Sequence, residues 1–158
     1  MAAPAGHTER QQAEVSRFGL YVLFVTIAIF FGALSVVFLL RGIGDVDWKG
    51  VPFPYMVWVS TAVIVASSVQ LHRGGRAAGI RLGWLFLACQ ALAWAQILAA
   101  RGPGSWFFWT FSGLHALHIL GGLGGFRWAR FETARTYWHF VTGLWLYVMA
   151  LFLLLRGR

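Results

Sequence analysis

Five long apolar stretches hold about two thirds of the residues of this chain, and none of them contains an aspartate or a glutamate. They cover residues 18–40, 53–71, 79–100, 106–126 and 137–155. An α-helix rises about 1.5 Å per residue, so about 20 residues cross the roughly 30 Å hydrocarbon core of a bilayer. Each stretch therefore predicts one spanning helix. Together they predict an all-α integral membrane bundle of five transmembrane helices.

The composition agrees with a single membrane domain. Of the 158 residues, 59% are hydrophobic, 17% are aromatic and 11% are charged, whereas a soluble domain carries about 25% charged residues. We expect residues 1–16 to form a polar N-terminal tail and residues 17–158 to form the membrane domain. The first apolar stretch is long enough to stay in the membrane, so it predicts an uncleaved helix rather than a signal peptide.

The basic residues predict the orientation. The net charge of +8 arises mainly from the short segments between the spans, where the positive-inside rule places Lys and Arg, so it does not indicate a nucleic-acid partner. The side that holds the N-terminus carries eight of them, namely Arg10, Arg17, Arg73, Arg76, Arg81, Arg127, Arg130 and Arg135. The opposite side carries five, namely Arg41, Lys49, Arg101, Arg156 and Arg158. This difference predicts a cytoplasmic N-terminus and an external C-terminus.

Three histidines within the spans are candidates for chemistry. His115 and His118 are three residues apart and share a helix face, and His139 lies in the inner half of the next span. Imidazoles from two facing helices commonly hold a membrane b-type haem, so His118 with His139 is one candidate pair. Intramembrane polar residues more often face the bundle interior and find hydrogen-bond partners there. That structural role is the leading prediction for all three histidines.

Other features argue against an independent transport or redox activity. Proton relays through membranes typically use chains of Asp, Glu or His, and here no carboxylate lies in any span. The histidines are bunched in the inner half and do not form a relay across the bilayer. Cys89 is the only cysteine, and we expect it to be a small core residue. Without a CxxC pair, zinc ribbons, iron–sulfur clusters and c-type haem attachment are not expected.

Small and basic residues suggest helix packing and lipid binding. Gly113, Ala116, Gly121 and Gly125 predict close approach of the fourth span to a neighbouring helix. The arginines of the inner side, together with Trp and His residues at the interface, could form a site for a phospholipid headgroup.

The last two spans carry motifs that resemble a known family. The segment 112–118, Ser-Gly-Leu-His-Ala-Leu-His, resembles the Thr-Gly-x-His-Gly-x-His motif of haem–copper oxidase subunit III. The segment 137–145 begins Tyr-Trp-His-Phe-Val and ends in Trp, which is similar to that family's Tyr-Trp-His-Phe-Val-Asp-x-x-Trp. Weaker similarities, in the same order as in the family, occur at Ser60-Thr61 with Ser67-Ser68, at residues 82–90 and at residues 31–34. The resemblance covers about residues 18–155.

The chain departs from that family at its carboxylates. Ile27 and Ala93 stand where the family commonly has glutamates buried in helices, and Thr142 replaces the aspartate of the last motif. Ala116 replaces the glycine between the two histidines. Any role of the family's carboxylates in proton uptake therefore does not transfer to this chain.

The resemblance implies a five-helix form of subunit III that holds no redox centre. In the family, haem and copper reside in subunits I and II, while subunit III packs against subunit I, binds lipid in a helical cleft and supports sustained turnover. The leading hypothesis is a non-catalytic accessory subunit in a bacterial inner membrane, with cytochrome c or quinol as the electron donor of the complex. It predicts oxidase subunits I and II and membrane lipid as partners, and no small-molecule substrate.

The resemblance therefore predicts no catalytic, cofactor-binding or metal-binding residue in this chain. Tyr137 and Trp138 are expected to fix the inner interface. The residues predicted to form hydrogen bonds in the bundle or to contact lipid are His115, His118, Tyr137, Trp138, His139, Ser67 and Gln90.

Three alternatives remain open at this point. The related accessory subunit of nitric oxide reductase has similar motifs and would differ only in its partner. A stand-alone haem-b electron carrier would use His118 and His139. A transporter is a further alternative, although the spans lack charged groups.

Overall fold

The computed structural model describes residues 5–44, 53–100 and 105–154, and these contain five α-helices and no β-strand. The helices are α1 (Ala5–Gly44), α2 (Tyr55–His72), α3 (Arg76–Ala100), α4 (Ser105–Trp128) and α5 (Phe131–Leu154). The all-α prediction is confirmed. The outer-side residues Lys49, Arg101, Arg156 and Arg158, which entered the charge comparison, lie outside the described residues.

Four of the helices are long and apolar enough to cross a membrane. They are α2, α5, and the segments Glu14–Gly44 of α1 and Arg76–Ala99 of α3. The 24 residues of α4 extend about 36 Å at 1.5 Å per residue, so α4 has the necessary length. Its serines, histidines and tryptophans lower its mean hydropathy, and α4 is not among the four helices that composition assigns as spans. The structure thus indicates a multi-pass membrane protein with four spans assigned by composition.

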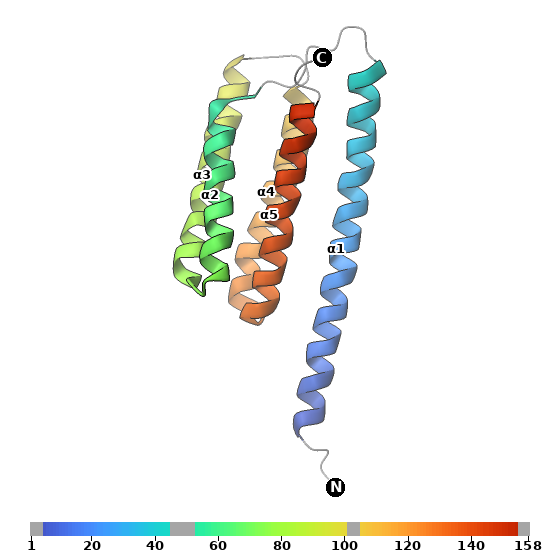
Figure 1. The fold of residues 1–158 in the computed structure, drawn as a ribbon, viewed down its shortest axis with the longest axis vertical. Helices are drawn as coiled ribbons and strands as arrows, with labels where there is room; N and C mark the ends of the chain where they lie inside the picture. Colours follow the sequence, from blue (N-terminus) through green and yellow to red (C-terminus); the bar gives the residue numbers. More distant parts are fainter. Residues whose placement is uncertain (1–4, 45–52, 101–104, 155–158) are drawn as a thin grey trace.

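The helices lie in three layers. Figure 1 shows the antiparallel pair α2–α3 on one side of the pair α4–α5, and α1 on the other side. Among the described residues, α1 contacts α4 and α5 but neither α2 nor α3. The connections α2–α3 and α4–α5 lie at the end of the bundle where α1 begins (Figure 1). We call this end, which carries Arg73, Arg76, Arg127 and Arg130, the inner end.

Helix α1 begins much earlier than the first apolar stretch. It starts at Ala5, so residues 5–16 of the predicted polar tail are helical. This segment is rich in Ala, Glu, Gln and Arg, which have high helix propensity, and it contains no proline. In Figure 1, α1 projects well beyond the other four helices at the inner end.

Aromatic rings hold α1 against the α4–α5 pair. Toward the end of the bundle opposite the inner end, the fully buried Phe38 of α1 meets Phe107 of α4 at a centroid distance of 4.9 Å and Phe152 of α5 at 5.4 Å. Nearer the inner end, Phe24 of α1 stacks on Phe140 of α5 at 4.1 Å. These contacts fix how α1 lies beside the pair, and hence the shape of the groove described below.

Candidate functional site

A row of hydrogen bonds joins α5 to α2. The indole nitrogen of Trp138 donates to Ser67 Oγ over 3.1 Å, and that of Trp145 donates to Thr61 Oγ1 over 2.9 Å. Next to the Trp138–Ser67 pair in both helices, His139 Nδ1 lies 2.6 Å from Ser68 Oγ. We call these three pairs the α2–α5 seam. They bring together two segments, the serine and threonine pairs of the second span and the Tyr-Trp-His segment of the fifth, that lie about 70 residues apart in the sequence.

Trp138 is fully buried, although the sequence predicted that it would fix the inner interface. Its ring lies between two glycines of neighbouring helices. A Cβ on Gly83 of α3 would stand 2.6 Å from Trp138 Cη2, and a Cβ on Gly122 of α4 would stand 3.1 Å from Cε3. The hydrogen bond to Ser67 and these two glycine surfaces leave the indole no room to turn. Trp138 is therefore a core residue that locks α2, α3, α4 and α5 together.

Two further polar contacts tie α3 to its neighbours. Ser60 of α2 donates to the Oε1 atom of Gln90 over 3.2 Å. The indole nitrogen of Trp94 donates to Ser112 of α4 over 2.9 Å. The hydrogen-bonding role predicted for Gln90 is thus found on its oxygen, while its nitrogen has no partner among the described residues.

His115 does not play the predicted hydrogen-bonding role within the described part of the chain. It is fully buried, and neither ring nitrogen has a hydrogen-bond partner there. Its ring instead lies 4.8 Å from the Trp145 ring and 5.6 Å from the Phe86 ring, centroid to centroid. His115 therefore packs as an aromatic ring in the core, against Trp145 and Phe86.

His118 and His139 face different helices. The Nδ1 atom of His118 lies 2.7 Å from the carbonyl oxygen of Leu114, one turn earlier in α4, and its ring packs on Phe31 of α1. His139 faces Ser68 and His72 of α2. Since α1 and α2 lie on opposite sides of the α4–α5 pair, the two imidazoles do not face a common space. The geometry therefore does not match a haem held between them.

Tyr137 joins the two motif-bearing helices. Its hydroxyl donates to the carbonyl oxygen of His118 over 3.1 Å. In the described residues, no group of three or more His, Cys, Asp or Glu side chains is arranged to hold a metal ion.

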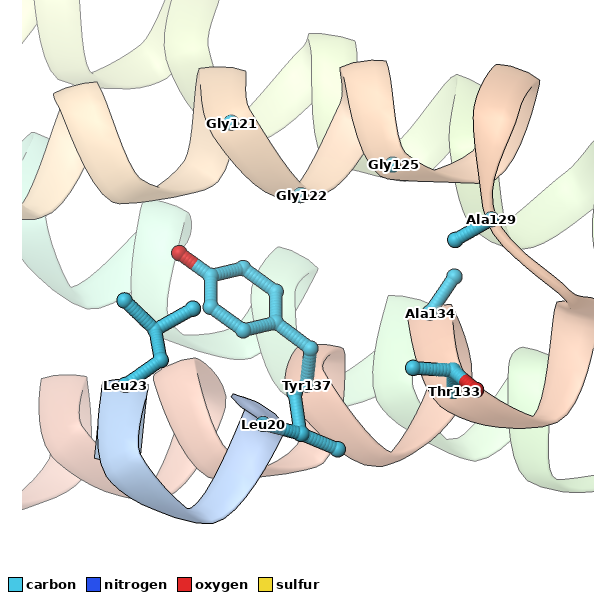
Figure 2. A pocket seen from close by; sticks show the side chains of 9 residues that line it. All are labelled: Leu20, Leu23, Gly121, Gly122, Gly125, Ala129, Thr133, Ala134 and Tyr137. Atoms are coloured by element: carbon cyan, nitrogen blue, oxygen red, sulfur yellow. The ribbon is translucent and has the colours of Figure 1, made fainter. Parts of the chain in front are cut away.

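A groove opens between α1, α4 and α5. Its apolar part has a volume of about 240 Å³ and is lined by Leu20 and Leu23 of α1, by residues 121, 122, 125 and 129, and by Thr133, Ala134 and Tyr137. Figure 2 shows the Tyr137 ring crossing this space toward Gly121 and Gly122, with Leu20 and Leu23 on the opposite wall. The glycines present bare backbone, so one side of the groove is smooth.

The groove continues toward the inner end as a more polar pocket. This second part has a volume of about 330 Å³ and shares Leu20 and Thr133 with the first. Arg17, Glu132 and Thr136 supply its polar groups. We call the two parts together the α1 groove. An apolar channel that ends beside an arginine has the amphipathic character of a phospholipid.

Two of the small residues of α4 do not have the packing role that the sequence predicted. Gly113 and Gly125 were expected to let α4 pack closely on a neighbour, yet a Cβ at either position would meet nothing within 4 Å. Close packing occurs at Gly122, which the sequence reasoning did not single out. The spacing of small residues shows which face of a helix lacks large side chains, but it does not show whether a neighbouring helix or an open groove lies against that face.

The inner end is strongly basic. Arg76 donates to the carbonyl oxygen of Phe126 and lies 5.9 Å above the Phe131 ring, while Arg135 pairs with Glu132. The other arginines there are exposed, and so is Trp128, which has 88% of its surface accessible. Such a combination of arginines and an exposed indole is typical of a membrane–water interface.

No protein-family model matches the chain, and no curated protein matches it either. The functional argument therefore depends on the residues and their geometry.

Proposed function

We propose that this chain is a non-catalytic accessory subunit, of the subunit III type, in a bacterial haem–copper terminal oxidase. The observation that carries the proposal is the α2–α5 seam. The segments that resemble subunit III motifs contact one another there, and they do so as packing elements. The indole nitrogens of Trp138 and Trp145 donate hydrogen bonds to hydroxyls of α2, and His115 lies among aromatic rings. In this proposal the chain has no catalytic centre, and haem and copper reside in subunits I and II.

The proposed topology has five spans, with the N-terminus in the cytoplasm and the C-terminus outside. The fifth span is α4, whose low hydropathy is offset by the burial of its polar side chains. Ser112 and His115 are fully buried, and His118 is half-buried against α1. Polar residues within membranes usually face the bundle interior. The arginines of the inner end support the orientation, because positive residues favour the cytoplasmic side.

We further propose that the α1 groove holds a phospholipid. Its apolar part fits an acyl chain against the glycine face of α4. Its polar part contains Arg17 and Thr136, which in the proposed topology lie near the membrane surface, where a headgroup phosphate is expected. Arginine attracts anionic lipid at the cytoplasmic leaflet by about 1 kcal/mol per residue near the surface. This proposal assigns the headgroup to Arg17 and the threonines rather than to the tryptophans and histidines first considered.

A pull-down from native membranes tests the accessory role. The tagged full chain would be isolated in mild detergent, its partners identified by mass spectrometry, and an optical spectrum recorded. Stoichiometric recovery of oxidase subunits I and II, with their haem bands, is the expected result. Recovery of nitric oxide reductase subunits would replace the oxidase with that partner. A lone chain that lacks haem would refute the accessory role, and a haem band in the isolated chain would favour an electron carrier.

A matched pair of leucine substitutions tests the lipid site. Gly125 lines the α1 groove and Gly124 does not, and both have open space at the Cβ position. Gly125→Leu is expected to fill the groove and reduce the phospholipid that co-purifies per chain, as quantified by lipid mass spectrometry. Gly124→Leu should retain the amount bound by the unmodified protein. Equal retention by the two variants would contradict the assignment.

A further inference from the structure

A pair of histidines lies at the inner end, where His139 of the α2–α5 seam meets His72 of α2. His72 is the last residue of α2 and is exposed, and His139 lies on the adjacent face of α5. Their ring centroids are 5.8 Å apart, with an angle of 60° between the planes. The pair is accessible through His72, and its two rings come from two different helices that the α2–α5 seam holds in place.

The nitrogens of His139 have different environments. Nδ1 lies 2.6 Å from Ser68 Oγ, whereas Nε2 is shielded from solvent and has no hydrogen-bond partner among the described residues. Ser68 and His72 are four residues apart and therefore share one face of α2. The two nitrogens point in different directions from the imidazole, so a ring that directs Nδ1 toward Ser68 directs Nε2 away from Ser68. The ring of His72 lies beside the ring of His139.

We propose that His72 and His139 form a binding site for a divalent transition-metal cation such as Zn²⁺ or Cu²⁺. Imidazole nitrogen suits these ions. With metal–nitrogen bonds of about 2.0 to 2.1 Å, two imidazoles on one ion have centroids roughly 4.5 to 6.5 Å apart, a range that includes the observed separation. The contact with Ser68 acts as the outer partner that orients a histidine ligand and fixes its tautomer.

The site differs from a structural zinc centre. Two protein ligands leave the remaining positions to water, so the ion would exchange with the cytoplasmic side rather than contribute to folding. Arg135 lies one turn from His139, and its positive charge opposes a cation there although it also pairs with Glu132. We therefore expect reversible binding at micromolar rather than nanomolar concentrations. The inference depends only on the contact between α2 and α5, and it is independent of the proposed accessory role and of the lipid site.

Copper titration of the full chain in detergent tests the site, because Cu²⁺ binds such ligands most tightly of the divalent first-row ions and has an electron paramagnetic resonance spectrum. The background variant His7→Ala removes the histidine near the N-terminus. In that background, one Cu²⁺ per chain is expected, with a pulsed spectrum showing two imidazole nitrogens. His72→Ala should weaken binding at least about tenfold and leave one imidazole, since even outer partners change metal affinity about 10–100-fold.

His118→Gln is the matched control, since His118 faces α1 and should not alter the titration. Ser68→Ala is a second variant, which keeps both ligands and should weaken binding without changing the number of coordinated imidazoles. His72 is exposed at a helix end, so its removal leaves the bundle intact. Unchanged affinity and an unchanged spectrum in His72→Ala would overturn the proposal, as would a background variant that binds no Cu²⁺ at micromolar concentration.

Discussion

Substitution of Gly83 by alanine tests whether the bundle is locked by Trp138. A Cβ at this position would stand 2.6 Å from Cη2 and 2.8 Å from Cζ2 of Trp138, and 3.1 Å from Leu123 Cδ2. The ring cannot retreat easily, because its nitrogen is bonded to Ser67 and its other edge is packed on Gly122. Adding a methyl group to a packed core costs about 1–3 kcal/mol of unfolding free energy.

The intrinsic helix preference works in the opposite direction. Alanine stabilises a helix interior by about 1 kcal/mol relative to glycine. Gly113→Ala isolates this gain, because Gly113 lies inside α4 and nothing stands within 4 Å of its Cβ position. We expect Gly113→Ala to be more stable than the unmodified protein by up to about 1 kcal/mol. Gly83→Ala should fall about 1–3 kcal/mol below Gly113→Ala.

The assay is the unfolding free energy of the purified full chain, measured by titrating dodecyl sulfate into mild-detergent micelles and following tryptophan fluorescence. A double-mutant cycle then assigns the cause. Trp138→Phe removes the two atoms closest to a Cβ on Gly83 and leaves Leu123 Cδ2 at 3.1 Å, so most of the cost of Gly83→Ala should disappear in that background. The reasoning is refuted if Gly83→Ala is as stable as Gly113→Ala, or if its cost is unchanged when it is combined with Trp138→Phe.

Two further substitutions probe the polar atoms of the bundle. Ser67→Ala removes the acceptor of Trp138 and the donor to the Gly79 carbonyl, so we expect a loss of about 0.6–1.7 kcal/mol in the same titration. Thr110→Ala removes a hydroxyl that donates to the Trp106 carbonyl in its own helix, so it should change the unfolding free energy less, and an equal loss would contradict the interhelical role. His115→Phe keeps a buried ring where no hydrogen bond is seen, and should leave the unfolding free energy unchanged or higher. A loss above about 1 kcal/mol would mean that His115 has a polar partner.

The sequence predicted the helices well because the signal for each one, a long run of apolar residues, lies within the helix itself. A stretch without carboxylates and with about 20 apolar residues has few alternatives to a helix in a bilayer. The largest difference is at the start of α1, where the helix continues to Ala5. Hydropathy locates the part of a helix that suits lipid, but it carries no signal for where a polar extension of the same helix begins.

The contacts within the candidate site were harder to predict. The polar partners of α2 and α5 are separated by roughly 70 residues, and spacing along one chain does not specify which faces meet. His115 and His118 share a helix face in the sequence, yet one ring packs on Trp145 and the other on Phe31. The α1 groove depends on the angle at which α1 lies against α4, which is set by rings such as Phe24 and Phe140.

The seam explains how a bundle of this composition can have one register. Apolar surface alone does not drive helix association in lipid, because the acyl chains are as apolar as the side chains. The hydroxyls of Thr61 and Ser67 each donate one hydrogen bond and accept another. Thr61 donates to the Val57 carbonyl and accepts from Trp145, while Ser67 donates to the Gly79 carbonyl and accepts from Trp138.

The spacing of these partners matches on the two helices. Trp138 and Trp145 are seven residues apart, about 10.5 Å along α5, and Thr61 and Ser67 are six apart, about 9 Å along the antiparallel α2. A shift of one turn would leave both indole N–H groups without these acceptors in a medium that supplies no water. An unpaired buried donor costs about 1–3 kcal/mol. Two such losses disfavour the shifted register, so the hydroxyls of α2 select the arrangement of α2 against α5 that also forms the histidine pair.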